Sequence, residues 1–162
     1  MSIEDIAFNI AENELLSINQ ARTEARTRMA EADSFVQETT RRSIDPDEEL
    51  FALAYIGPTA AGSTGLKGKK GTPVVRPFCR HLVGKAFTVK DFKTANNFQT
   101  PTHPRISRGG YNCRHTITPV IDDDEVFKAM KLVRGTVADV KNANQAAQNA
   151  RKRKGRKRRR RK

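Results

Sequence analysis

Apolar residues recur at spacings of three and four through the first forty positions, which is the pattern of one face of an α-helix. The pattern predicts one long helix over residues 3–42, inside an N-terminal helical arm of residues 1–45. Ser2 and Asp5 have the spacing of a helix-capping pair, and the Asp-Pro step at Pro46 is typical of a helix end. The stripe consists of Ala11, Leu15, Ile18, Ala25, Met29, Ala32 and Val36.

A second stripe with the same spacing follows the acidic run DDDE at 122–125, whose carboxylates favour the positive end of a helix dipole. It predicts a helix over 122–149 and a C-terminal helical part over 122–150. The stripe consists of Val126, Met130, Val133, Val137 and Val140. Such a short stripe suits either a coiled-coil seam with another chain or packing on the body of the protein.

Shorter elements separated by turn signals occupy residues 46–121, which we expect to form a compact α+β unit. Candidate strands are 86–89 and 111–118, and 46–54 is compatible with a further helical turn. The stretch 57–75 is rich in Gly, Thr and Lys. It lacks the spacing of a phosphate-binding loop, so we expect it to be a surface loop insertion. The predicted fold class is therefore α+β.

Composition limits the size of the core. Hydrophobic residues make up 36% of the 162 residues, and the chain has no Trp. The long helices are therefore expected to cover their apolar faces against a partner protein or in an oligomer. No apolar run approaches 18 residues, and the N-terminus MSIEDIAF lacks the pattern of a signal peptide, so we expect no membrane contact.

The net charge of +13 is concentrated at the C-terminus. Eleven of the last twelve residues are Lys or Arg, whereas the other 150 residues carry 20 basic and 18 acidic side chains. Such a block repels itself, so we expect 151–162 to be a basic tail that is disordered when free. A solubilising tail and a localisation signal are alternatives, but the charge density favours non-specific, salt-sensitive contact with the phosphates of double-stranded DNA. The predicted DNA-binding residues are Arg151, Lys152, Arg153, Lys154, Arg156, Lys157, Arg158, Arg159, Arg160, Arg161 and Lys162.

Two short segments each contain a cysteine followed two residues later by a histidine. Cys79 and His81 form the first pair, and Cys113 and His115 form the second. On strands, each pair would project from one face, and two Cys with two His are a full tetrahedral set for a structural zinc ion. The one-residue gap is tighter than usual for zinc. A Cys79–Cys113 disulfide and buried free thiols are the alternatives.

Catalysis has little support in the sequence. A cysteine and a nearby histidine could act as nucleophile and base, but neither cysteine lies in a recognisable nucleophile motif. We therefore expect a protein that is not an enzyme and that has no cofactor apart from the candidate zinc.

Four motifs together resemble one known family. ARTE at 21–24, YIGP at 55–58, RPFCRHLVGKAFT at 76–88 and GGYNCRHTITPV at 109–120 resemble segments of the phage head-morphogenesis family, the minor head proteins related to the F protein of phage Mu. The resemblance covers about residues 15–121. The family residues matched are Arg22, Glu24, Arg76, Pro77, Gly84, Tyr111, Asn112 and Arg114.

The chain departs from that family at the long insertion, and Val75 stands where the family has Thr. Arg22 also interrupts the alanine-rich stripe, for which an ion pair or a cap contact would account. The resemblance implies a virion minor head protein that docks on the portal or major capsid protein, after assembly in the host cytoplasm. It places the chain in the capsid interior or at the portal vertex, with the basic tail near packaged DNA. A capsid-lining or cement protein and a zinc-stabilised nucleic-acid-binding protein are the alternatives.

Overall fold

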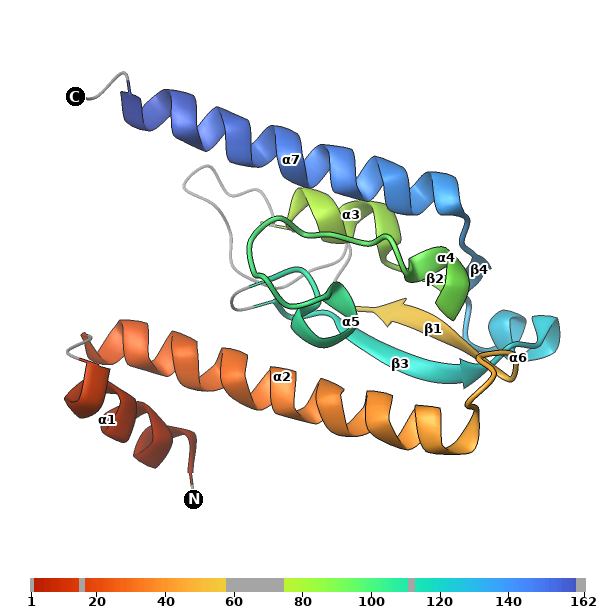
Figure 1. The fold of residues 1–162 in the computed structure, drawn as a ribbon, viewed down its shortest axis with the longest axis horizontal. Helices are drawn as coiled ribbons and strands as arrows, with labels where there is room; N and C mark the ends of the chain where they lie inside the picture. Colours follow the sequence, from red (N-terminus) through yellow and green to blue (C-terminus); the bar gives the residue numbers. More distant parts are fainter. Residues whose placement is uncertain (1, 15–16, 58–74, 111–112, 160–162) are drawn as a thin grey trace.

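The computed structural model describes residues 2–14, 17–57, 75–110 and 113–159, and within them it has an α+β fold, as the sequence predicted. A four-stranded sheet in the order β3-β1-β2-β4 lies between helices (Figure 1). Strand β1 pairs antiparallel with β2 and β3, and β4 pairs parallel with β2. The strands are β1 Phe51–Ile56, β2 Lys85–Thr88, β3 Thr116–Ile121 and β4 Val133–Arg134. The insertion expected at 57–75 lies almost wholly outside the described residues.

The strand boundaries correct two expectations. Residues 51–56 form the central strand and not a helical turn, because the run FALAYI is buried along most of its length and suits a strand covered on both faces. Strand β2 matches the candidate at 86–89 to within one residue. Strand β3 spans Thr116–Ile121, so the candidate at 111–118 was placed five residues too early at its start and three at its end.

The core lies on one face of the sheet. Leu53 and Tyr55 of β1 point toward three helices, α3 Pro77–Leu82, α4 Val89–Phe92 and α7 Val137–Arg159. The side chains that share this cluster with them include Phe78, Leu82, Phe87, Phe92 and Val140. The opposite face carries small residues, Ala52, Ala54 and Ala86, beside Phe127 of α6 Asp124–Ala129. The large side chains therefore gather on the face that holds Tyr55.

The predicted helix over 3–42 is wrong in one respect, because the chain forms two helices, α1 Ile3–Glu14 and α2 Ile18–Ile44. Ser17 starts α2 with a complete capping box, in which its side chain and that of Gln20 each accept a backbone N–H of the other residue. Helix α1 folds back along the first part of α2 (Figure 1). The predicted Ser2–Asp5 cap and the helix end just before Asp45 are both confirmed.

The predicted helix over 122–149 is also divided. Helix α6 ends at Ala129, and a turn with Lys131 at φ 56° leads through β4 into α7. Gly135 follows β4 and lies so close to the ring of Phe87 that a Cβ there would be 2.2 Å from it. The tight approach requires glycine at this position, and it interrupts the apolar spacing that predicted one continuous helix. The acidic run does cap a helix as expected, because Asp123 accepts backbone N–H groups at the start of α6.

Helix α7 packs on the body of the protein and not in a coiled-coil seam. Val140, Ala143 and Ala147 are buried in the main core, where α7 lies along α3 (Figure 1). The backbone of residues 151–159 continues this helix, where the sequence predicted disorder. Lys and Arg have good helix propensity, and a helix nucleated by packing extends more readily than one that must start alone. No helix in the described part of the chain is long and apolar enough to cross a membrane.

Candidate functional site

The two cysteine-containing segments meet beside the sheet. Helix α3 begins with Pro77 at its first turn and directs Cys79 into the core, where its side chain is fully buried. The segment that precedes β3 brings Cys113 to the same place, with its Sγ 3.7 Å from the Sγ of Cys79. The Nδ1 atom of His115 lies 3.6 Å from the Sγ of Cys113. The three donor atoms are all within 4.8 Å of one another.

His81 does not belong to this cluster. Cys79 and His81 lie on helix α3 and not on a strand, so two residues of separation turn their side chains by about 200°. Cys79 is therefore buried, whereas His81 is exposed. The predicted set of four ligands is reduced to Cys79, Cys113 and His115. His115 comes just before β3, so its contact with Cys113 does not depend on the alternation of side chains along a strand.

Tyr55 of the central strand completes the buried cluster. Its hydroxyl donates a hydrogen bond to the Sγ of Cys79 at 3.2 Å, and its ring lies 5.4 Å from the ring of His115. Burial first, and then the neighbouring Cys79, raises the pKa of Tyr55 well above its ordinary value, so the phenol is a neutral donor. Sequence reasoning missed this role, although Tyr55 opens the YIGP motif.

The two thiols share one hydrogen bond, and their pKa values are shifted in opposite directions. The hydrogen bond from Cys79, and then the contact with His115, lowers the pKa of Cys113 below its ordinary value. The same interaction with Cys113, and then burial, raises the pKa of Cys79. The pair therefore favours one thiolate beside one thiol. Both cysteines are free in the structure, so the predicted disulfide alternative is not the state observed.

Two glycines let the backbone approach this cluster. A Cβ on Gly109 would lie 2.2 Å from the Sγ of Cys79 and 2.9 Å from that of Cys113. A Cβ on Gly57 would lie 2.6 Å from the ring of His115. Both positions therefore require glycine for space. The pair Gly109-Gly110 is a turn signal in the sequence, but the contact of Gly109 with both sulfur atoms could not be predicted from it.

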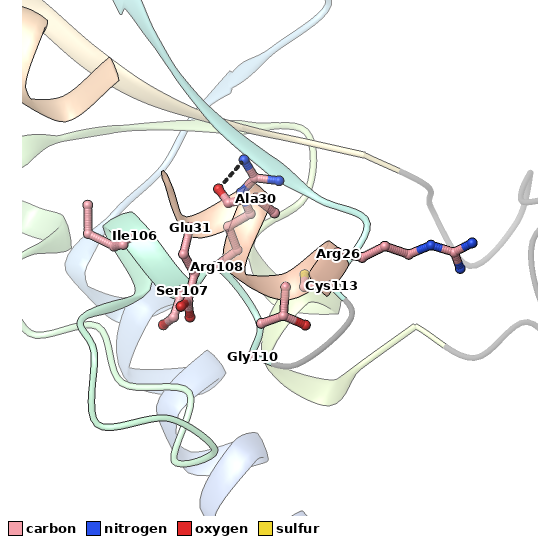
Figure 2. Close-up of a pocket in the computed structure, with 9 residues that line it drawn as sticks. Arg26, Ala30, Glu31, Ile106, Ser107, Arg108, Gly110 and Cys113 are labelled. Atoms are coloured by element: carbon pink, nitrogen blue, oxygen red, sulfur yellow. Dashed lines mark hydrogen bonds between the residues drawn. The ribbon is translucent and has the colours of Figure 1, made fainter. Parts of the chain in front are cut away.

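A hollow beside Cys113 connects the cluster with helix α2 (Figure 2). It has a volume of about 40 Å³ and lies between α2 and the turn that follows α5 Pro104–Ser107. Arg108 lines this hollow. Its side chain donates hydrogen bonds to Ser34 Oγ at 2.9 Å and to the carbonyl of Ala30 at 3.0 Å. Arg108 is 7% exposed, and nothing in the sequence marked it as buried.

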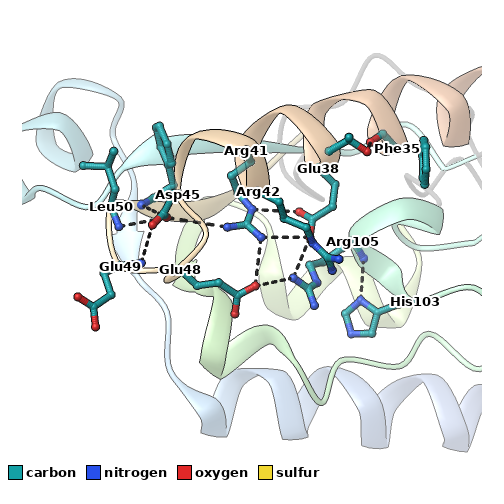
Figure 3. A network of polar contacts seen from close by, with 12 residues as sticks. Phe35, Glu38, Arg41, Arg42, Asp45, Glu48, Glu49, Leu50, His103 and Arg105 are labelled. Carbon is teal, nitrogen blue, oxygen red and sulfur yellow. Dashed lines mark hydrogen bonds and ion pairs between the residues drawn. The ribbon is translucent and has the colours of Figure 1, made fainter.

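A second group of polar contacts holds α5 against the C-terminal half of α2 (Figure 3). Arg105 of α5 pairs with Glu38 at 2.9 Å, and the fully buried Arg41 pairs with Glu38 and with Glu48. Burial alone would raise the pKa of Glu38, but hydrogen bonding and charge from Arg41, together with the charge of Arg105, outweigh it and lower that pKa. These ion pairs keep α2 fixed beside the sheet, and so they fix one wall of the hollow.

The matched family residues have varied surroundings. Arg22 forms the ion pair that was expected of it, with Glu4 of α1 at 2.9 Å, and Glu24 pairs with Arg28 along α2. The ARTE motif therefore contributes to the α1–α2 contact. Its ion pairs are at least partly exposed, which limits their contribution to about 1 kcal/mol or less.

The other matched positions surround α3. Arg76 precedes Pro77 at the start of α3, and its guanidinium donates a hydrogen bond to Gln99. Gly84 has φ 78°, a conformation that glycine adopts without strain. Arg114 is exposed between Cys113 and His115. The matched residues Tyr111 and Asn112 lie outside the described residues.

The predicted DNA-binding residues extend from the end of α7. Arg151, Lys152 and Arg153 are exposed on the helix, away from the packed core. Residues 154–159 continue the helical backbone, and their side chains lie outside the described part, as do residues 160–162 altogether. The basic segment and the Cys/His cluster are therefore separate features of the molecule. Comparison with family models, curated proteins and solved structures finds no match to this chain.

Proposed function

We propose that this chain is a phage minor head protein that docks on the portal or capsid and contacts packaged DNA with its basic C-terminal segment. The single observation that carries the DNA contact is the continuation of the core-packed helix α7 into a segment with eleven basic residues in twelve. A helix that is anchored through Val140, Ala143 and Ala147 presents its charges at a fixed place on the body. The resemblance of four motifs to the head-morphogenesis family supports the virion setting.

The chemistry of the basic segment favours contact with phosphates over the recognition of bases. Residues 151–162 contain no aromatic side chain for stacking and no Asn or Gln for base edges. Residues 151–159 span about 13 Å as a helix, which is enough to lie beside several phosphates of a duplex. Binding should therefore be independent of sequence, and it should weaken steeply with salt because each neutralised phosphate releases a counterion.

The DNA contact is tested by deleting residues 151–162 from the full chain. We expect two unrelated duplexes to bind the full chain with similar affinity and a steep salt dependence in fluorescence anisotropy. The deletion should lower the affinity at least tenfold at low salt and flatten the salt slope. Circular dichroism should show the same melting temperature for the body.

A matched pair of variants separates charge from helix length. Arg151, Arg153 and Arg156 changed together to Lys should retain binding, whereas the same three changed to Gln should lower both the affinity and the salt slope. Equal affinity of the deletion variant and the full chain at low salt would reject a DNA-binding role for the segment.

The virion role is tested in purified particles by quantitative mass spectrometry with cross-linking. Low copy number and cross-links to the portal would support a minor head protein. High copy number and cross-links to the main shell protein would instead support a capsid-lining or cement protein. Absence from particles would reject both structural roles in the mature virion.

A further inference from the structure

We propose that Cys79, Cys113 and His115 bind a zinc ion that joins helix α3 to the segment preceding β3. This inference goes beyond the proposed function and does not depend on it. It rests on three converging donor atoms from two segments that are more than thirty residues apart in the chain. Two thiolate sulfurs and one imidazole nitrogen are a donor set that suits Zn²⁺.

The distances between the donors fit a common tetrahedral centre. With Zn–S of about 2.3 Å and Zn–N of about 2.0 Å, tetrahedral geometry puts two sulfurs about 3.8 Å apart and sulfur and nitrogen about 3.5 Å apart. The measured separations are 3.7 Å between the Sγ atoms of Cys79 and Cys113, and 3.6 Å between Cys113 Sγ and His115 Nδ1. Two edges of the tetrahedron are therefore already at the lengths that zinc requires.

The charge balance of the cluster also favours a divalent ion. Two thiolates would be costly to bury side by side, but with Zn²⁺ and a neutral imidazole the total charge is zero. Tyr55 then acts as an outer hydrogen-bond donor, because its hydroxyl lies 3.2 Å from the Sγ of Cys79. Among the described residues three side chains provide ligands, which leaves the fourth position of a tetrahedral ion to a water molecule.

Gly109 has a role that this proposal explains. Its missing side chain leaves room for both sulfur atoms, and a Cβ there would lie 2.2 Å from one and 2.9 Å from the other. A pair of sulfurs that merely fill the core would not need backbone so close to both of them. The absence of a side chain at Gly109 therefore leaves the two sulfurs at the separation that a shared ion demands.

The test is made on the full chain, purified under reducing conditions. The zinc content is measured by elemental analysis, and Co²⁺ is then added to the metal-free protein. We expect one zinc per chain and, with Co²⁺, a thiolate-to-cobalt charge-transfer band together with the intense visible bands of a tetrahedral site. Chelation should lower the melting temperature, and Zn²⁺ should restore it.

The variants assign the ligands. Cys113→Ser and His115→Ala should each weaken Co²⁺ binding at least tenfold and shift the spectrum, and Tyr55→Phe should weaken it less than either. His81→Ala is the matched control, because His81 occupies the same position in the other Cys-x-His pair but is exposed. It should leave the spectrum unchanged. Circular dichroism identifies any variant that does not fold.

Three outcomes would overturn the proposal. The first is reduced, folded wild-type chain that takes up neither Zn²⁺ nor Co²⁺, which leaves only a hydrogen-bonded thiol pair. The second is protein isolated with a Cys79–Cys113 disulfide that binds no metal after reduction. The third is loss of the cobalt spectrum in His81→Ala, which would restore the ligand set expected from sequence and reject the one in the structure.

Discussion

At the residue scale, Gly109 is a position where one added methyl group should have a large local effect. A Cβ there would approach the Sγ atoms of Cys79 and Cys113 to 2.2 and 2.9 Å. Both sulfurs are packed in the core cluster or against it, so they have little room to move. Gly109→Ala should therefore destabilise the fold by about 1–3 kcal/mol, the usual cost of overpacking a core. Urea denaturation followed by circular dichroism measures this change.

A double-mutant cycle shows whether the sulfur contact is the cause. Cys79→Ala removes the nearer sulfur, so Gly109→Ala should cost less in that background than in the wild-type chain. Gly84→Ala is a useful comparison, because no atom lies within 4 Å of its added Cβ and its cost comes from the backbone at φ 78°. Its effect should be the same with or without Cys79. Equal costs of Gly109→Ala in both backgrounds would contradict the proposed contact.

Three of the four ligands that the sequence predicted converge in the structure. The fourth was wrongly included because of a local choice of secondary structure. The repeated Cys-x-His spacing drew attention to Cys79, Cys113 and His115, which do converge. The inclusion of His81 depended on treating its segment as a strand. Pro77 was the available signal against that choice, because proline is favoured in the first turn of a helix. The contribution of Tyr55 could not be predicted, since it depends on strand pairing across the sheet.

At the scale of elements, Arg108 fixes helix α2 to the sheet unit. Its guanidinium donates to Ser34, to the carbonyl of Ala30 and to Asp33, and it is almost fully buried. Arg108→Met should cost roughly 2–4 kcal/mol, because it removes several hydrogen bonds of a buried charged group. Arg108→Lys should retain only part of this stability, since an ammonium group lacks the planar fork of donors. Denaturant titration measures both.

Asp33→Asn provides the control for that prediction. The Asp33 side chain is 58% exposed, so its ion pair with Arg108 is screened by water and should contribute little. A loss of stability in Asp33→Asn as large as that in Arg108→Met would show that the ion pair with Asp33, and not the hydrogen bonds to Ser34 and Ala30, supplies the contribution of Arg108. The same loss in both variants would therefore contradict the prediction that the exposed ion pair contributes little.

The junction between α2 and β1 should make stability depend on pH. Burial alone would raise the pKa of Asp45, but hydrogen bonds from the backbone N–H groups of Glu49, Leu50 and Phe51 outweigh it and hold the pKa below its ordinary value. The ionised carboxylate therefore contributes stability above its unfolded-state pKa of about 4. That contribution is lost as the pH falls from there through the lower folded-state pKa.

Asp45→Asn tests this prediction. It should be less stable than wild type at pH 7, and its urea midpoint should fall less than that of wild type between pH 7 and pH 3. The exposed Asp47 gives a matched control, because Asp47→Asn removes a carboxylate two residues away that lies at the surface. Its pH profile should follow wild type. Parallel profiles for Asp45→Asn and wild type would contradict the assignment.

The spacing of apolar residues could not predict the two helix breaks. The stripe continues through the break before Ser17, since Leu15 and Ile18 keep the helical spacing. The only local signal was the capping box of Ser17 with Gln20, which a stripe-based assignment overlooks. The break near Gly135 depends on a close approach to Phe87 from a strand nearly fifty residues away. Long-range contacts of that kind leave no periodic trace in the sequence.

At the scale of the whole molecule, the α1–α2 contact is separate from the sheet core. Its cluster contains Ala7, Ile10, Ala21 and Ala25, small residues for the most part, which share no member with the clusters on the sheet. Small side chains bury little apolar area, so this contact contributes little free energy. Arg108, Arg105 and their partners on α2 attach the later part of that helix to the sheet unit instead.

Deletion of residues 1–16 should therefore leave the sheet unit folded. We expect a melting temperature within a few degrees of the full chain by calorimetry, because the sheet-face core that contains Phe78 and Phe87 is intact. In hydrogen exchange of the full chain, α1 should exchange well before β1 and α3, since small clusters open at low free-energy cost. Cooperative loss of the sheet on deletion would instead make α1 part of the core. The measured order of exchange shows whether α1 opens independently of the sheet core.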